Sequence, residues 1–317
     1  MPLSRKSLFA ILGMLVWIFL TWRLFPHIRD TFQNGESLLE NLSFNLLAIA
    51  VLLIPINYGI EAIKWYYLVF RKTNNGYWPA YKSVLSGMAL GILTPNRIGE
   101  PFARALMAPC GNYLTTAAAA LICSFSQQAA TLLFGILGMI TIANKYNSTS
   151  ANLLWFIGIG AILLALSLSL LLLSPSLLKW TANHHFTQRV KKSMANLELF
   201  TIKQVATVLV LSFIRYSIFL AQYIFVLYAF GCNLAILQAA SAVACIFLVG
   251  SIIPLPAVID IGVKISLAML FLGSTRNNEE VAAAASTTIW IMNIAIPALT
   301  GTIFVISSPF IRKKQSI

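Results

Sequence analysis

The chain has 317 residues, of which 59% are hydrophobic and only 10% are charged, and its mean hydropathy is +0.82. Soluble domains carry about a quarter charged residues, so this composition excludes an ordinary soluble protein and a disordered chain. The 22 Lys and Arg against 9 Asp and Glu give a net charge of +13. In a membrane protein such an excess is first explained by topology, so we expect no nucleic-acid partner. The composition predicts an all-α polytopic membrane protein.

The first apolar stretch, residues 8–22, resembles either a signal peptide or a membrane helix. No small-x-small cleavage site follows it, and we interpret it as an uncleaved anchor. Five further stretches are long enough to cross roughly 30 Å of hydrocarbon at about 1.5 Å per residue. They lie at about 42–70, 113–143, 151–173, 203–230 and 281–307. About six spanning helices are therefore expected.

Two other apolar stretches are interrupted near their middle. Residues 78–108 are broken by Thr94-Pro95-Asn96 and again by Pro101, and residues 235–272 by Pro254-Leu255-Pro256. Proline cannot continue the interior of a helix, and each half is too short to cross a bilayer alone. We expect two re-entrant helical hairpins that enter the membrane from opposite sides.

The basic residues support this topology. If both hairpins return to the side they came from, 14 basic residues lie on the cytoplasmic side and 4 on the outer side. The cytoplasmic set is Arg5, Lys6, Lys64, Arg71, Lys72, Lys82, Lys179, Arg189, Lys191, Lys192, Lys203, Arg312, Lys313 and Lys314, and the outer set is Arg23, Arg29, Lys145 and Arg276. Both termini are then cytoplasmic, and a bacterial inner membrane is the expected location.

The same arithmetic predicts a repeat within a single transmembrane domain that spans residues 1–317. Residues 42–143 and 203–307 each contain a helix, a broken hairpin and a second helix, in opposite orientations. Inverted repeats with broken helices near the midplane are the architecture of alternating-access transporters. The alternative is a coincidence of hydropathy.

The segment from Leu93 to Arg104, LTPNRIGEPFAR, carries the most informative polar cluster. Because Pro101 suits the first turn of a helix, we expect a helix to start near Glu100 and residues 94–99 to be irregular. Arg97, Glu100 and Arg104 then gather at a helix N-terminus, which could bind an anion such as phosphate. The alternative, weighted equally, is a structural ion pair that clamps the hairpin.

This segment resembles the Pro-x-Arg-x-Gly-Glu-x-x-Arg signature of the flippase-like family that includes the transmembrane domain of lysylphosphatidylglycerol synthases. Arg215 in an apolar helix, Gly231, the Pro254-x-Pro256 turn and Gly262 fit the second half of that family. Together these matches cover residues 42–307. No aminoacyl-transfer domain follows Ile317, so the resemblance implies lipid translocation and not lipid synthesis.

One departure concerns the second half-site. Where the family has a Gly-Gly-x-Gly-x-x-Glu run, this chain has Ala257 to Lys264, with Asp260 and Lys264 in its place. These two side chains are spaced to pair on one helix face. They could form the outer half of a headgroup path, although a mutually neutralising pair near the outer interface is slightly favoured.

Three other groups of polar residues could have a role. Arg215 lies near the expected midplane, where it could bind a phosphate or pack against Glu100 or backbone carbonyls. Asn57, Glu61 and Lys64 share one face of their helix and are interpreted as mainly interfacial. The loop over residues 175–203 is basic and is expected to lie against anionic headgroups at the cytoplasmic face.

The sequence thus predicts a lipid flippase or transporter that moves an anionic lipid or lipid-linked headgroup across the inner membrane. Its expected substrate-binding residues are Arg97, Glu100, Arg104, Arg215, Asp260 and Lys264. No catalytic residue, metal or cofactor is expected, because the His and Cys residues form no metal-binding or nucleophilic pattern. The alternatives are an accessory membrane subunit and an intramembrane lipid-modifying enzyme. The oligomeric state stays open, a homo-oligomer included.

Overall fold

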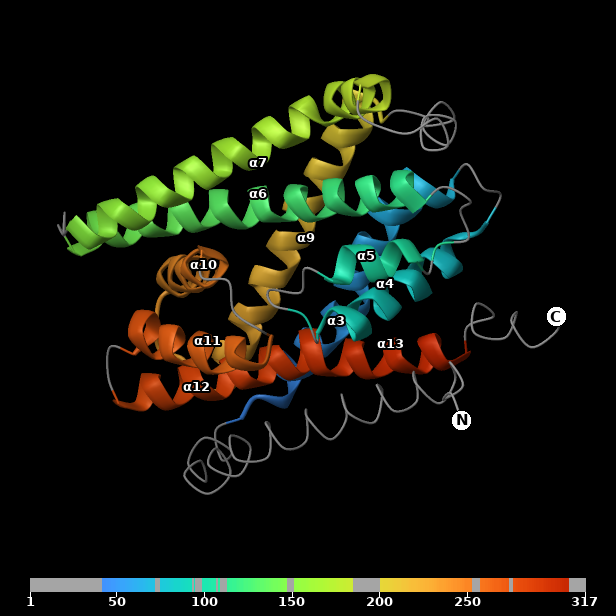
Figure 1. Cartoon of the computed structure of the whole chain (residues 1–317). Coiled ribbons are helices and arrows are strands. Elements are labelled where there is room, and N and C mark those ends of the chain that lie inside the picture. The colour runs from blue at the N-terminus through green and yellow to red at the C-terminus, as the bar shows by residue number, and fades with distance from the viewer. Residues whose placement is uncertain are drawn as a thin grey trace, which may run out of the picture.

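A computed structural model describes residues 42–71, 75–92, 94, 99–106, 108, 113–146, 151–184, 200–252, 257–273 and 276–307. The regular structure in these ranges is entirely helical, as the composition predicts (Figure 1). The helices are α3 (Phe44–Trp65), η1 (Tyr66–Phe70), α4 (Tyr77–Gly91), α5 (Gly99–Leu106), α6 (Tyr113–Tyr146), α7 (Ala151–His184), α9 (Ile202–Ala229), α10 (Ile236–Ile252), α11 (Ala257–Leu272), α12 (Arg276–Trp290), η2 (Ile291–Ala295) and α13 (Ile296–Ser307). The anchor expected at residues 8–22 lies outside the described residues.

Five helices in the described ranges are long and apolar enough to cross a membrane. They cover Phe44–Phe70, Thr115–Asn144, Leu154–Ser174, Ile202–Ala229 and Asn278–Ser307, which confirms the five spans expected there. α3 and η1 form one continuous span even though Pro55 lies inside it. Large apolar side chains on the outside of the bundle, such as Leu52, Trp155 and Ile162, suit contact with lipid.

The two interrupted stretches each form a pair of short helices, α4 with α5 and α10 with α11. α5 begins at Gly99, so Pro101 is its third residue. The first four N–H groups of a helix have no partner within the helix, so the N–H that proline lacks costs no helical hydrogen bond here. The predicted start near Glu100 is therefore confirmed, and Gly99, which was expected to be irregular, is already helical. Pro95 and the Pro254–Pro256 turn lie outside the described residues.

Two glycines let the arms of the first hairpin approach closely. A Cβ placed on Gly91 would lie 2.6 Å from the Cβ of Glu100, and one placed on Gly87 would lie 3.0 Å from the Cβ of Arg104. A larger side chain at Gly91 would therefore push α5 away from α4. The hydroxyl of Thr94 accepts a hydrogen bond from the backbone N–H of Gly99 (2.8 Å) and so joins the two ends of the connecting segment.

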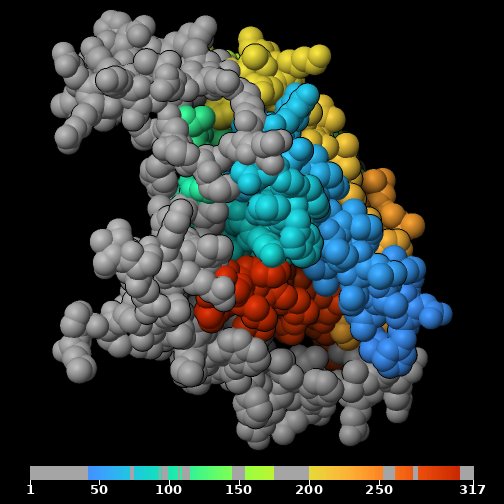
Figure 2. Space-filling model, turned by 90° about the vertical axis from the view of Figure 1, so that its right-hand side faces the viewer, coloured from blue at the N-terminus to red at the C-terminus, as the bar shows by residue number. Residues whose placement is uncertain are grey.

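The helices pack in pairs that join the first and second halves of the chain. α3 lies antiparallel to α9, since Ser43 at the start of α3 donates its N–H to the carbonyl of Ala229 at the end of α9 (2.9 Å). α6 packs against α7 and α10, and α4 packs against α13. Figure 2 shows α4 lying directly on α13 with α3 beside it. The halves are therefore interleaved and not separate bodies.

Two boundaries differ from the sequence expectation. Residues 175–184 continue α7 as helix, where a basic loop over 175–203 was expected. The last span begins at the polar residues of α12 and contains a π-helical segment, η2, where Asn293 is buried. Its N-terminal turn carries Glu279, so hydropathy alone placed the start of this span too late.

α9 starts as a capping box, in which Thr201 and Gln204 satisfy each other's backbone N–H groups.

Candidate functional site

Glu61 of α3 lies at the centre of a buried ion-pair network. Its Oε1 is 2.6 Å from Nη1 of Arg104, and its Oε2 is 2.7 Å from Nζ of Lys64 and 3.1 Å from Nη1 of Arg215. Only 6% of the Glu61 side chain is exposed, and Lys64 is fully buried. Buried charges persist when they are paired, and here one carboxylate holds cations from α3, α5 and α9.

Arg104 joins the first hairpin to α3. Its Nη2 lies 2.7 Å from Oε1 of Glu100, and the guanidinium stacks over Trp65, with 5.6 Å between Cζ and the ring centroid. The Arg104 carbonyl accepts a hydrogen bond from Ser83 of α4 (3.0 Å), which in turn accepts one from the indole of Trp65 (3.2 Å). Arg104 is therefore fixed on several sides.

The interpretation of Asn57, Glu61 and Lys64 as interfacial residues was wrong. All three are buried, with exposed fractions of 2%, 4% and 0%. The face was identified correctly from the spacing, but it points into the bundle, where Lys64 donates a hydrogen bond to Ser212 (3.0 Å). Lys64 is therefore paired inside the bundle, and Glu61 is the site residue that the sequence reasoning missed.

Arg215 of α9 lies where α3, α6 and α9 meet. Its Nε donates to Oδ1 of Asn57 (2.7 Å), and its Nη1 donates to Oε1 of Gln127 (3.1 Å) as well as facing Glu61. Its guanidinium also lies over the ring of Tyr58, 6.0 Å from the centroid. Arg215 thus pairs with Glu61. The packing alternative in the sequence analysis had named Glu100 as its carboxylate partner.

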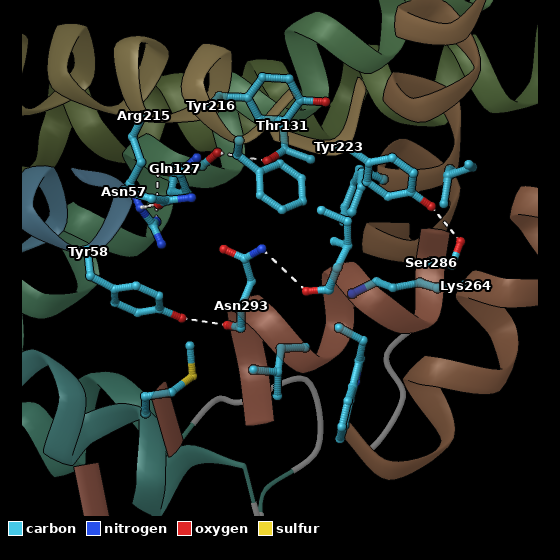
Figure 3. A pocket seen from close by; sticks show the side chains of 17 residues that line it. Asn57, Tyr58, Gln127, Thr131, Arg215, Tyr216, Tyr223, Lys264, Ser286 and Asn293 are labelled. Atoms are coloured by element: carbon cyan, nitrogen blue, oxygen red, sulfur yellow. Dashed lines mark hydrogen bonds between the residues drawn. The ribbon is translucent and has the colours of Figure 1, made fainter. Parts of the chain in front are cut away.

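A cavity of about 130 Å³ lies beside Arg215, which is one of its lining residues (Figure 3). Polar side chains and aromatic rings line it together. Its polar and aromatic lining includes Asn57, Gln127, Arg215, Tyr216, Lys264, Trp290 and Asn293. Figure 3 shows Arg215 and Lys264 entering the cavity from different sides, with the amide of Asn293 between them.

The predicted site residues divide into three groups. Arg215 and Lys264 line the cavity, and Lys264 lies over Phe247 with 5.2 Å between Nζ and the ring centroid. Glu100 and Arg104 belong to the ion-pair network and are not among the cavity-lining residues. Arg97 lies outside the described residues, as does the side chain of Asp260, whose backbone is in the first turn of α11.

A metal site is not formed by the described part of the chain, where no three His, Cys, Asp or Glu side chains are grouped to hold an ion. The polar groups of the cavity are a guanidinium, an ammonium, amides, an indole and hydroxyls. Such groups bind anions and hydrogen-bonding ligands.

The helices and this network define an all-α, multi-pass membrane protein with a cavity inside its helix bundle that polar, aromatic and aliphatic side chains line together. A family model described as the lysylphosphatidylglycerol synthase TM region matches residues 8–301. The chain belongs to this family, as the LTPNRIGEPFAR segment had suggested. No curated protein matches the chain.

Proposed function

We propose that the protein is a lipid transporter that moves an anionic phospholipid or lipid-linked headgroup between the leaflets of the membrane. The family to which it belongs bears the name of a lipid synthase, which connects the chain with lipid handling. The observation that carries the proposal is Arg215. Its Nε and Nη1 atoms are engaged, while its Nη2 has no partner among the described residues and belongs to a side chain that lines the cavity.

The charge around this cavity favours an anion. Within the described residues the network contains three cations, Lys64, Arg104 and Arg215, against the carboxylates Glu61 and Glu100. One positive charge is therefore left over in the network, which borders the cavity through Arg215. A phosphate could take the remaining N–H groups of Arg215 in charge-assisted hydrogen bonds.

The neighbouring network has a structural role in this proposal. Arg104 is held by both carboxylates and by Trp65, so we infer that Glu100 and Arg104 clamp the hairpin while Arg215 meets the substrate. The sequence left open an anion site and a structural ion pair. In this proposal Glu100 and Arg104 form the structural ion pair, and Arg215 belongs to the anion site. Transport is favoured over headgroup chemistry because the described cavity lining offers hydrogen-bond donors and amides rather than a base paired with a nucleophile.

The location and partners belong to the same proposal. The basic asymmetry of the sequence supports a bacterial inner membrane with both termini cytoplasmic, and the partners are membrane phospholipids. A transporter of this kind needs neither a metal nor a cofactor. An accessory subunit would differ in one respect, because the purified chain would move no lipid by itself.

The test is leaflet exchange in proteoliposomes that contain only the purified chain. A labelled phosphatidylglycerol should exchange faster in these proteoliposomes than in protein-free vesicles. In the same proteoliposomes, a labelled phosphatidylcholine with the same acyl chains should exchange more slowly than the phosphatidylglycerol. Equal rates with and without protein would contradict transport and favour the accessory role. Equal acceleration of both lipids would contradict selection of an anion.

A further inference from the structure

The last membrane span is irregular beside the cavity. Between α12 and α13, η2 is a π-helical segment, after which the N–H of Ile296 donates to the carbonyl of Ile291, five residues back. Pro297 follows as the second residue of α13 and has no N–H to donate. π-helical turns and prolines are among the usual causes of a kink in a long helix. Here the two adjoin each other, so this part of the span is its weakest point.

Side chains from other helices complete the hydrogen bonds at this point. In an α-helix the carbonyl of Asn293 would accept the N–H of residue 297, which is proline. It accepts instead from the hydroxyl of Tyr58 of α3, as Figure 3 shows. Nδ2 of Asn293 donates to Oε1 of Gln222 of α9 (2.9 Å) and to the carbonyl of Ile289 (3.3 Å). The conformation of η2 therefore depends on contacts that can be broken without unfolding a helix.

The two halves of the span pack against different hairpins. α12 packs against α11 of the second hairpin, and α13 packs against α4 of the first (Figure 1). The contact between α13 and α4 is close, because a Cβ on Gly301 would overlap the carbonyl oxygen of Leu85 and lie 3.1 Å from the Cβ of Ala89. η2 thus joins one half that is fixed to the first hairpin and one half that lies on the second.

We propose that η2 and Pro297 form a hinge, about which α13 and the first hairpin rotate against α12 and the second hairpin. The bond from Tyr58 to the carbonyl of Asn293 is the latch that holds the arrangement described here. Hinges are short segments at the ends of elements that absorb such rotations. Because Trp290 and Asn293 line the cavity, the rotation changes its shape. This motion goes beyond the proposed function, since it belongs to the fold whatever passes through the cavity.

Two buried polar atoms at the hinge support a second arrangement. Nε1 of Trp290 and Oδ1 of Asn293 have no hydrogen-bond partner within the described residues. Polar atoms inside proteins are almost always hydrogen-bonded. A rotation of α12 against α13 moves both atoms relative to their neighbours and can supply the missing bonds. The energy that the rotation loses at the Tyr58 latch is then partly recovered at these atoms.

Distances between pairs of spin labels test the motion in the purified full-length chain in bilayer nanodiscs. Leu270 of α11 and Ile303 of α13 are exposed and lie on opposite sides of the hinge. Trp78 of α4 and Ile303 are exposed and lie on the same side. We expect two populations of distance for the first pair and one for the second. Cys110→Ser provides the background, because Cys123, Cys232 and Cys245 are buried.

Two variants connect the distances to the hinge residues. Tyr58→Phe removes the latch and should shift the Leu270–Ile303 pair toward its second distance. Pro297→Ala returns an N–H to the helix and should leave that pair with a single distance. The Trp78–Ile303 distance should stay the same in both variants. A single Leu270–Ile303 distance shared by wild type and Tyr58→Phe would overturn the inference.

Leaflet exchange of labelled phosphatidylglycerol in proteoliposomes adds a matched comparison of two prolines. Pro297→Ala should not lower the melting temperature, because proline disfavours a helix interior, and it should slow exchange several-fold. Pro55→Ala, at an exposed position inside α3 and away from η2, should likewise not lower the melting temperature and should retain exchange. Equal exchange by the two variants would overturn the hinge.

The two measurements separate this inference from the proposed function. If wild type moves no lipid but Leu270 and Ile303 show two distances that Pro297→Ala reduces to one, the hinge stands and the proposed function fails. If wild type moves lipid while the Leu270–Ile303 distance is the same in every variant, the proposed function stands and the hinge is overturned.

Discussion

Asn57 and Arg215 each occupy the fourteenth position of their helix, α3 and α9, and they meet where the two helices cross. Nε of Arg215 donates to Oδ1 of Asn57 over 2.7 Å. Because the helices are antiparallel, equivalent positions meeting at the crossing indicate an approximate twofold axis through this pair. An inverted repeat would place an axis there.

Contacts on either side of the crossing follow the same relationship. Gln222 is the twenty-first residue of α9, and it donates to the carbonyl of Ala50, the seventh residue of α3. Lys64 is the twenty-first residue of α3, and it donates to Ser212, whose hydroxyl bonds the carbonyl of Val208, the seventh residue of α9. These pairings support the predicted repeat of residues 42–143 and 203–307, which stays a prediction for the chain as a whole.

An exchange of the two crossing residues tests this symmetry. Asn57→Arg alone adds a second buried cation beside Arg215 and should lower the melting temperature strongly. The double variant Asn57→Arg/Arg215→Asn restores one cation and one amide at the crossing, so it should recover part of the loss. We expect an interaction energy of about 0.5–3 kcal/mol from the thermal unfolding of the four proteins. Additive effects would contradict a symmetric crossing.

The central carboxylate should matter more for stability than its neighbour. Glu61→Gln leaves three buried cations without their shared partner and should cost about 3–5 kcal/mol of folding free energy. Glu100→Gln removes one contact from a more exposed side chain, 19% exposed against 6% for Glu61, and should cost less. Thermal unfolding in the same detergent compares the two. A larger loss for Glu100→Gln would contradict the central position of Glu61.

The close approach of α4 and α5 predicts a difference between two glycines. Gly91→Ala places a Cβ against the backbone of Glu100 and should destabilise the protein by about 1–3 kcal/mol through overpacking. Gly158→Ala in α7 meets nothing within 4 Å and should be neutral or stabilising. Melting temperatures of the two variants check this, and equal effects would contradict the described hairpin contact.

The topology can be checked with single cysteines and an impermeant thiol reagent. Asn233 lies exposed in the turn after α9, on the expected outer side, and Gly76 lies exposed before α4, on the expected inner side. Asn233→Cys should be labelled in intact cells, and Gly76→Cys only after permeabilisation. Asn278, which the sequence would suggest as an outer probe, is buried and is unsuitable.

The native thiols set the background of that experiment. Cys123, Cys232 and Cys245 are buried. Burial also raises the pKa of the Cys232 thiol, which lies in the turn after α9, so little reactive thiolate forms there at neutral pH. These three thiols should therefore label weakly, and the experiment uses a Cys110→Ser background because Cys110 lies outside the described residues. Labelling of Gly76→Cys from outside would overturn the proposed orientation.

The sequence predicted the helices well because hydropathy and proline act locally. The start of α5 followed from Pro101, and the Glu100–Arg104 pair followed from their spacing along one helix. The importance of Glu61 could not be obtained in this way. Its partners Arg104 and Arg215 are distant in the sequence, and the aromatic residues beside Lys64 are typical of a membrane interface.

A usable signal was nevertheless present in α3. Asn57, Glu61 and Lys64 share one face, while Val51, Leu52, Ile56 and Ile63 are exposed apolar residues. In a membrane helix, a polar face opposite an apolar one is expected to point into the bundle. The cavity itself was beyond prediction, because Arg215, Lys264 and Asn293 come from three helices whose packing no local pattern specifies.

The most direct test of the account compares the same substitution at two arginines. Arg215→Lys and Arg104→Lys each keep a positive charge and lose the planar fork that binds phosphate or carboxylate through two hydrogen bonds. Leaflet exchange of labelled phosphatidylglycerol, measured per folded molecule beside the melting temperature, distinguishes them. The account predicts that Arg215→Lys slows exchange by about tenfold or more, and that Arg104→Lys lowers the melting temperature while exchange is retained. Normal exchange by Arg215→Lys would contradict it.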